Sequence, residues 1–303
     1  MNVLVVGDEI GAGSGATDND HRWANLFQKE LQNKYGVEVN LTNLSMSGNT
    51  SYAGYVRVMG LVDGIDYDLV LICFGQNDEE EELSLYYESV IRAIRSRYSK
   101  AAVIAILESS QKDYTSKIKT IQNVAEHYGI PVADTVAPFM AAYDALTKDS
   151  VRPNDGGYYV YCKTVMDVIE PYVSDLRGDD PAIITVIIEK VTELDTFTWF
   201  GADQFVREGN TFSLSTLISG TVIGIDYNYI PGENICTIYV DDEEFAVLKA
   251  THNGDSSQRR IVVVSDETGS INVKHEIKIV FPDDEFGKAQ ADGFIGVAIS
   301  GGK

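Results

Sequence analysis

The chain has 303 residues, of which 44% are hydrophobic and 23% are charged, as in ordinary globular proteins, and its length suggests two domains. The formal net charge of −22 argues against binding to nucleic acid or to an anionic membrane surface, because acidic side chains repel phosphates. Three scattered cysteines predict neither a disulfide framework nor a metal site, and no apolar run approaches the about 20 residues that span a bilayer.

The first part of the chain alternates between predicted strands and predicted helices. The opening run of β-branched residues at 3–6 predicts a buried parallel strand, and Gly7-Asp8-Glu9 follows it as a tight turn. Further strands are predicted at 37–41, 68–74, 101–107 and 131–133, and helices at 23–35, from Asn49 to Met59, and at 83–98, 114–128 and 157–173. Short connections between alternating strands and helices predict a flavodoxin-like three-layer α/β/α domain over residues 1–176.

The pattern changes after a polar segment at 174–181, which contains Gly178 and Pro181 and predicts a linker. Beyond it, helical periodicity disappears. Apolar runs at 182–191, 219–230, 235–240, 260–265 and 275–281 are separated by Gly, Asn, Asp and Pro. About eight short strands in this region predict an all-β sandwich of jelly-roll type over residues 182–303.

Four short blocks stand where strands end, at 3–13, 43–51, 72–78 and 149–158. The carboxyl ends of strands in an open α/β sheet are where ligands usually bind. Together, the blocks resemble those of the SGNH (GDSL-type) hydrolase family, whose members are mostly esterases and acylhydrolases. The resemblance covers roughly residues 1–175 and implies the same α/β/α fold.

Two positions depart from the family's pattern. Glu9 stands where the resemblance implies a nucleophilic serine, and Arg152 stands where it implies a histidine, while Asp149 matches the family's aspartate. Gly48 and Asn77 match the residues that donate hydrogen bonds to the oxyanion. We take these five residues as the candidate site and expect no cofactor.

The paired substitution predicts charge compensation. A carboxylate at position 9 lies where the oxyanion would form, so Gly48 and Asn77 are expected to donate to Glu9, and Arg152 is expected to pair with it. This interpretation favours a protein that has lost its Ser/His pair and serves as a non-catalytic glycan-binding or structural module. Its expected partner is a carbohydrate or an acylated glycan, and its oligomeric state is left open.

Three alternatives remain at this point. The first is a GDSL-type esterase or acylhydrolase that acts on carbohydrate esters with displaced catalytic residues. Its candidate groups are Ser14, Ser45, Ser47, Ser51, His21, His127, His252 and His275. The second uses Glu9 and Asp149 as a carboxylate pair, as glycosidases do. The third is a protein of adhesion or assembly in which the β-sandwich is the active part.

Aromatic residues and the turn at Asp8 each have two interpretations. Tyr52 and Tyr158 are predicted to contact a ligand, against the alternative that they pack in the core. A sugar-stacking platform could be formed by Trp199, Phe200, Tyr227 and Tyr229, unless these aromatic residues fill the sandwich core. Asp8 is expected to bond backbone N–H groups within its turn. Met1 leads directly into the first strand, so we expect no signal peptide, which leaves a cytoplasmic protein or a processed secreted one.

Overall fold

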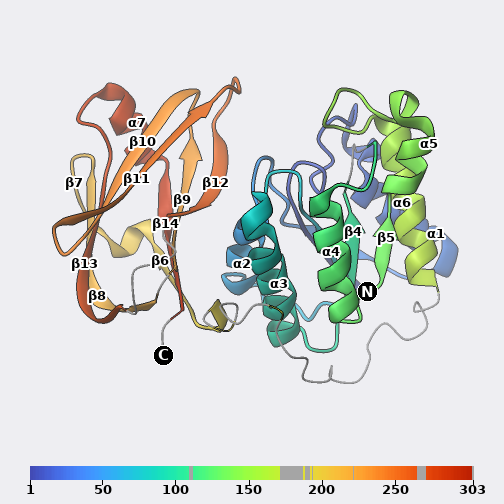
Figure 1. Cartoon of the computed structure of the whole chain (residues 1–303), viewed down its shortest axis with the longest axis horizontal. Helices are drawn as coiled ribbons and strands as arrows, with labels where there is room; N and C mark the ends of the chain where they lie inside the picture. The colour runs from blue at the N-terminus through green and yellow to red at the C-terminus, as the bar shows by residue number, and fades with distance from the viewer. Residues whose placement is uncertain are drawn as a thin grey trace. The chain divides into compact units, whose positions relative to one another are not determined.

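A computed structural model describes residues 1–108, 112–170, 187, 192, 194–220, 222–264 and 271–301. The chain divides into two compact units, Met1–Ile188 and Glu189–Lys303, which are treated separately below (Figure 1). The predicted linker at 174–181 and nearly all of the predicted strand at 182–191 lie outside the described residues. Within the described ranges, no helix has both the length and the apolarity that crossing a bilayer requires.

The first unit is built on a parallel sheet. Its strands are β1 (Asn2–Gly7), β2 (Asn40–Asn43), β3 (Leu69–Cys73), β4 (Ala102–Leu107) and β5 (Val132–Asp134). They are arranged in the order β2-β1-β3-β4-β5, which is the flavodoxin-like order and confirms the predicted fold class. β3 is buried along its whole length, as expected of a central strand that has helices on both faces.

Helices cover both faces of this sheet (Figure 1). They are α1 (Trp23–Tyr35), α2 (Ser51–Met59), α3 (Glu80–Arg97), α4 (Ser116–His127), α5 (Val136–Leu146) and α6 (Asp155–Ile169). α1 begins and ends where periodicity predicted, because Gly36 adopts a left-handed conformation (φ 66°) as its C-cap. α5 was not predicted; it tolerates Pro138 in its first turn and is kinked at Ala142.

The second unit is a sandwich of two antiparallel sheets, in the orders β11-β10-β13-β8-β7 and β12-β9-β14-β6. The strands are β6 (Phe197–Gly201), β7 (Val206–Glu208), β8 (Thr211–Gly220), β9 (Val222–Tyr229), β10 (Gly232–Val240), β11 (Glu243–His252), β12 (Gln258–Val263), β13 (Ile271–Val280) and β14 (Phe294–Ser300). One short helix that was not predicted, α7 (Glu285–Asp292), accompanies them. The prediction of a β-sandwich is confirmed.

The aromatic platform weighed for this unit is not formed by Tyr227 and Tyr229. Both are buried, at 0% and 7% exposure, and their ring centroids lie 4.5 Å apart inside the apolar core. The alternation of β9 turns every second side chain toward the opposing sheet, and these tyrosines fall on that inner face together with Ile225. They therefore stabilise the sandwich from within.

Candidate functional site

Glu9 lies in the turn that follows β1, and its carboxylate is held by two donors from other parts of the chain. The backbone N–H of Gly48 donates to Glu9 Oε2 at 2.9 Å, and Asn77 Nδ2 donates to the same oxygen at 2.7 Å. Gly48 has a φ of 70°, a conformation that residues with a Cβ rarely adopt. The predicted contact of Glu9 with both donors is thus present.

Arg152 does not form the predicted ion pair with Glu9. Its guanidinium donates to Asp149 Oδ2 through Nε at 2.8 Å and Nη2 at 2.7 Å. In the part of the chain that the structure describes, no contact joins Arg152 to Glu9, so this prediction is wrong. The physical reason is proximity, because Asp149 lies three residues earlier in the same loop and meets the guanidinium without spanning the site.

The Asp149 carboxylate is stabilised in its charged form. Partial burial raises its pKa, but the backbone N–H groups of Arg152 and Val151, together with the guanidinium, hold the pKa of Asp149 below its ordinary value. The two backbone bonds to Oδ1 measure 2.7 and 2.9 Å. The charge of Asp149 is therefore neutralised within its own loop by Arg152. The negative charge of Glu9 is stabilised separately, by the hydrogen bonds from Gly48 and Asn77.

This arrangement predicts additivity in a double-mutant cycle. Glu9→Ala and Arg152→Ala should change the free energy of unfolding independently, within about 0.3–0.5 kcal/mol, because the two side chains share no partner. The cycle of Asp149→Ala with Arg152→Ala is the matched control and should show a coupling of about 0.2–1 kcal/mol for a solvent-exposed pair. Urea denaturation of the six proteins measures both cycles. A coupling of about 1 kcal/mol or more between positions 9 and 152, as residues in contact show, would contradict the observed pairing.

Two buried carboxyl groups, those of Asp8 and Glu108, lie near Glu9. Asp8 is fully buried and Glu108, which follows β4, is 2% exposed. Asp8 Oδ1 accepts from the N–H of Ile10 at 2.9 Å, as expected of a turn aspartate, and Asn77 Nδ2 approaches Asp8 Oδ2 at 3.3 Å. The side chains of Asp8 and Glu108 also hydrogen-bond to each other.

Burial governs the protonation of this pair. It raises the pKa of Asp8 well above its ordinary value and raises that of Glu108 to about 8, with the nearby Glu9 charge adding to the effect. The two carboxyls therefore hold a proton between them at neutral pH. Glu108 was not among the candidate site residues predicted from the sequence. A glutamate that directly follows the apolar run of β4 would have indicated it, because polar residues at strand ends often belong to a site.

The tyrosines predicted to contact a ligand lie in the core. Tyr52 and Tyr158 are both 0% exposed, so neither side chain reaches a surface site. Tyr158 donates its hydroxyl to the carbonyl of Ser14 at 2.6 Å, and Tyr52 packs edge-on against Tyr86 with ring centroids 5.1 Å apart. Tyr52 lies on the buried face of α2 and Tyr158 on the buried face of α6, which explains the helical spacing of the tyrosines in the sequence.

Ser14, Ser47, Ser51 and His21, which are among the candidates for displaced catalytic groups, all have hydrogen-bond partners. Ser14 Oγ lies 3.0 Å from Ser47 Oγ, and Ser47 directly precedes Gly48. Ser51 donates through its N–H and its hydroxyl to the buried carboxylate of Asp78. His21 is exposed, and its Nδ1 lies 2.8 Å from Asp18 Oδ1. Because Ser47 is adjacent to Gly48 in the sequence, the Ser14–Ser47 pair has one hydroxyl group next to a residue that donates to Glu9.

Comparison with known proteins agrees with this architecture. Residues 5–160 match the model of the GDSL-like Lipase/Acylhydrolase family. The chain is 40% identical over 78 residues to esterase TesA of Pseudomonas aeruginosa, a match that covers 26% of this chain and only 38% of that enzyme.

Solved structures extend the likeness to both units. A two-domain esterase (CEX) active on acetylated mannans, co-crystallised with mannopentaose, covers 100% of this chain and 91% of its own, with a TM-score of 0.78 at 17% identity. The crystal structure of TesA covers 57% of this chain and is itself covered completely, with a TM-score of 0.50 at 23% identity. At these identities the likeness concerns the fold.

Proposed function

Within the GDSL-like lipase/acylhydrolase family, to which the chain belongs, we propose that this protein recognises acylated polysaccharide but binds it without serine-type ester hydrolysis. The observation that carries the proposal is the position of the Glu9 carboxylate, 2.9 Å from the N–H of Gly48 and 2.7 Å from Asn77 Nδ2. These are the two residues that match the family's oxyanion donors. Glu9 supplies no hydroxyl for acyl transfer at that point.

The physical argument concerns the charge that develops during ester hydrolysis. Attack on an acyl carbon turns the carbonyl oxygen into an oxyanion, and donors preorganised for that charge supply much of the rate. In this chain the donors already hold an anion. A second negative charge at the same place would be repelled, so the transition state gains nothing from Gly48 and Asn77 while Glu9 remains there.

The proposed ligand class is suggested by a protein of similar fold. The esterase whose structure covers both units of this chain is active on acetylated mannans and was crystallised with mannopentaose. We extend the ligand class, although not the reaction, to this protein. An acetylated mannan oligosaccharide is therefore the first ligand to test.

Two measurements on the full chain test this function. Calorimetric titration with acetylated mannopentaose should give binding, and acetate release from the same ligand should stay at the buffer rate. Chemically deacetylated mannopentaose serves as the control for recognition of the acyl group. Absence of binding to the acetylated oligosaccharide would overturn the proposed ligand class, and acetate release above the buffer rate would overturn the non-catalytic role.

A second candidate is a carbohydrate esterase with a displaced nucleophile, which the family membership and the fold of the mannan esterase favour. The specific observation is the pair of hydroxyls of Ser14 and Ser47, 3.0 Å apart beside Gly48. Acetate release that Ser14→Ala or Ser47→Ala abolishes would support this candidate. Release that survives both changes but is lost in Glu9→Gln would instead assign the chemistry to Glu9.

A further inference from the structure

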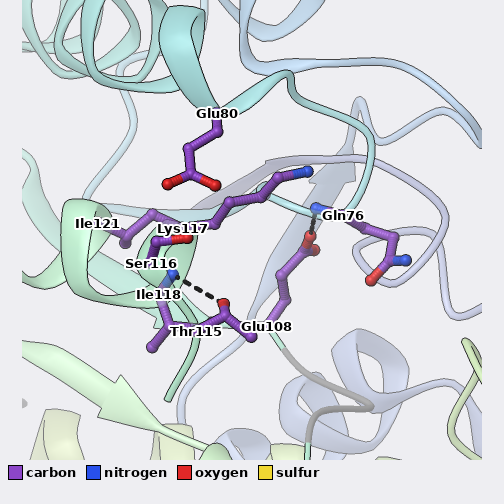
Figure 2. A pocket seen from close by; sticks show the side chains of 9 residues that line it. Gln76, Glu80, Glu108, Thr115, Ser116, Lys117, Ile118 and Ile121 are labelled. Atoms are coloured by element: carbon purple, nitrogen blue, oxygen red, sulfur yellow. Dashed lines mark hydrogen bonds between the residues drawn. The ribbon is translucent and has the colours of Figure 1, made fainter. Parts of the chain in front are cut away.

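A cavity of about 280 Å³ opens in the first unit where β3 and β4 end and α4 begins. Figure 2 shows its side chains, which come from three separate segments of the chain. It is lined by Gly75, Gln76, Glu80, Glu108, Thr115, Ser116, Lys117, Ile118 and Ile121. Asn77, which contacts Glu9, directly follows two of these residues in the chain.

The walls of the cavity are held in place by hydrogen bonds. Glu108 accepts from the backbone N–H of Gln76, and Gly75 reaches this position with a φ of 140°, which favours glycine. Thr115 caps α4 by accepting from the N–H of Ile118 at 3.3 Å. The cavity is therefore formed by the folded unit itself before any ligand arrives.

Its charges are balanced, although the chain carries a net charge of −22. Lys117 contributes one ammonium and Glu80 one carboxylate, and neither lies within ion-pair distance of an opposite charge among the described residues. Burial raises the pKa of Asp78, and the Lys117 charge partly offsets that rise. Figure 2 shows Glu80, Lys117 and Glu108 directed toward the same space. Glu108 shares a proton with Asp8, so its carboxyl carries less than a full negative charge at neutral pH.

The donors and acceptors suit hydroxyl groups. The ammonium of Lys117 donates, the carboxylate of Glu80 accepts, and the hydroxyls of Thr115 and Ser116 do both. Ile118 and Ile121, at 3% and 0% exposure, pack directly behind these polar groups and leave almost no apolar surface open to a ligand. A negatively charged ligand would meet Glu80, and a positively charged one would meet Lys117, so the balanced lining favours a neutral polyhydroxylated molecule.

We propose that this cavity binds one neutral sugar unit, with Lys117 and Glu80 as its main hydrogen-bonding groups. The proposal rests on the proposed function, because it assigns this cavity to a sugar unit of the polysaccharide. It makes Lys117 and Glu80 determinants of specificity rather than groups that take part in chemistry.

The test uses the full chain with ¹³C-labelled isoleucine methyl groups and mannobiose as the probe. Mannobiose should shift the methyl resonances of Ile118 and Ile121, and Lys117→Ala should weaken the apparent Kd at least tenfold, the loss expected when a hydrogen bond to a charged group is removed. Glu80→Gln should weaken it less, because the amide keeps an acceptor. Lys119→Ala, which removes a lysine of the same helix that does not line the cavity, is the matched control.

Each outcome bears on the cavity separately from the proposed function. Methyl resonances that do not move, equal binding by the Lys117→Ala and Lys119→Ala variants, or tighter binding of mannuronate than of mannose would overturn the assignment of the cavity. Acetylated mannopentaose that binds the wild type and the Lys117→Ala variant equally would leave the proposed function standing and overturn the cavity. If mannobiose shifts the methyl resonances of Ile118 and Ile121 but acetylated mannopentaose does not bind, the cavity assignment stands and the proposed function is overturned.

Discussion

The combined change Glu9→Ser and Arg152→His is expected to create an esterase, with hydrolysis of p-nitrophenyl acetate on the order of 10²–10³-fold above buffer. The change removes the anion that Gly48 and Asn77 now hold and supplies a hydroxyl in its place. Asp149 already binds the side chain at position 152, with Oδ2 2.8 Å from Arg152 Nε, so it is placed to orient an imidazole there. Nucleophile, base, orienting carboxylate and oxyanion donors would then all be present.

The single variants are the controls for this gain. Glu9→Ser alone lacks a base and Arg152→His alone lacks a nucleophile, and since these groups act as a unit, each should stay close to the buffer rate. Glu9→Ala combined with Arg152→His frees the Gly48 N–H and the Asn77 amide from Glu9 without supplying a hydroxyl, so it separates the contribution of these two donors. The gain should remain far below that of an evolved esterase, because a catalytic group must be held within about 0.5 Å of its productive position.

Wild-type hydrolysis as fast as that of the double variant would show that ester hydrolysis by this protein requires neither a serine at position 9 nor a histidine at position 152. Equal rates for the double variant and the Glu9→Ala control would show that Ser at position 9 does not act as the nucleophile. Either result would favour a nucleophile from the Ser14–Ser47 pair, whose hydroxyl oxygens are 3.0 Å apart.

The stability of the first unit is expected to fall as the pH rises from about 4.5 to about 8, because Glu108 has a raised pKa in the folded state. The folded protein binds a proton that the unfolded chain has already released in this range, so raising the pH favours unfolding. Burial raises the pKa of Asp8 in the same direction. The loss should be on the order of 2–4 kcal/mol and complete once the pH exceeds the folded pKa.

Urea denaturation at pH 5.5 and pH 8.5, followed by the helical circular dichroism signal that comes mainly from the first unit, measures this effect. Glu108→Gln removes one titrating group and should reduce the difference in unfolding free energy between the two pH values. Glu80→Gln, at an exposed glutamate of the same cavity, is the control and should leave the difference as in the wild type. A wild-type stability that does not change between the two pH values would contradict a shared proton at Asp8 and Glu108.

The local sequence determined most of the architecture. The apolar run of β3 identified a central strand, Gly36 marked the end of α1, and the alternation of strands and helices predicted the order of layers that the structure has. These signals are local, because burial on one face of a helix or on both faces of a strand imposes a period that neighbouring residues display. The meeting of Glu9 with Gly48 and Asn77 was predicted from the resemblance of the four blocks to the family's motifs.

Only the tertiary structure decided the partners of the charged groups. Arg152 binds Asp149 instead of Glu9, and Asp8 meets Glu108 because the order β1-β3-β4 brings the ends of two strands that are distant in sequence to one edge of the sheet. The burial of Tyr52 and Tyr158 was decided in the same way, by which faces of α2 and α6 pack inward. Residue types state what a side chain can bind, but its partner and its protonation depend on distances and burial that arise only when remote segments pack together.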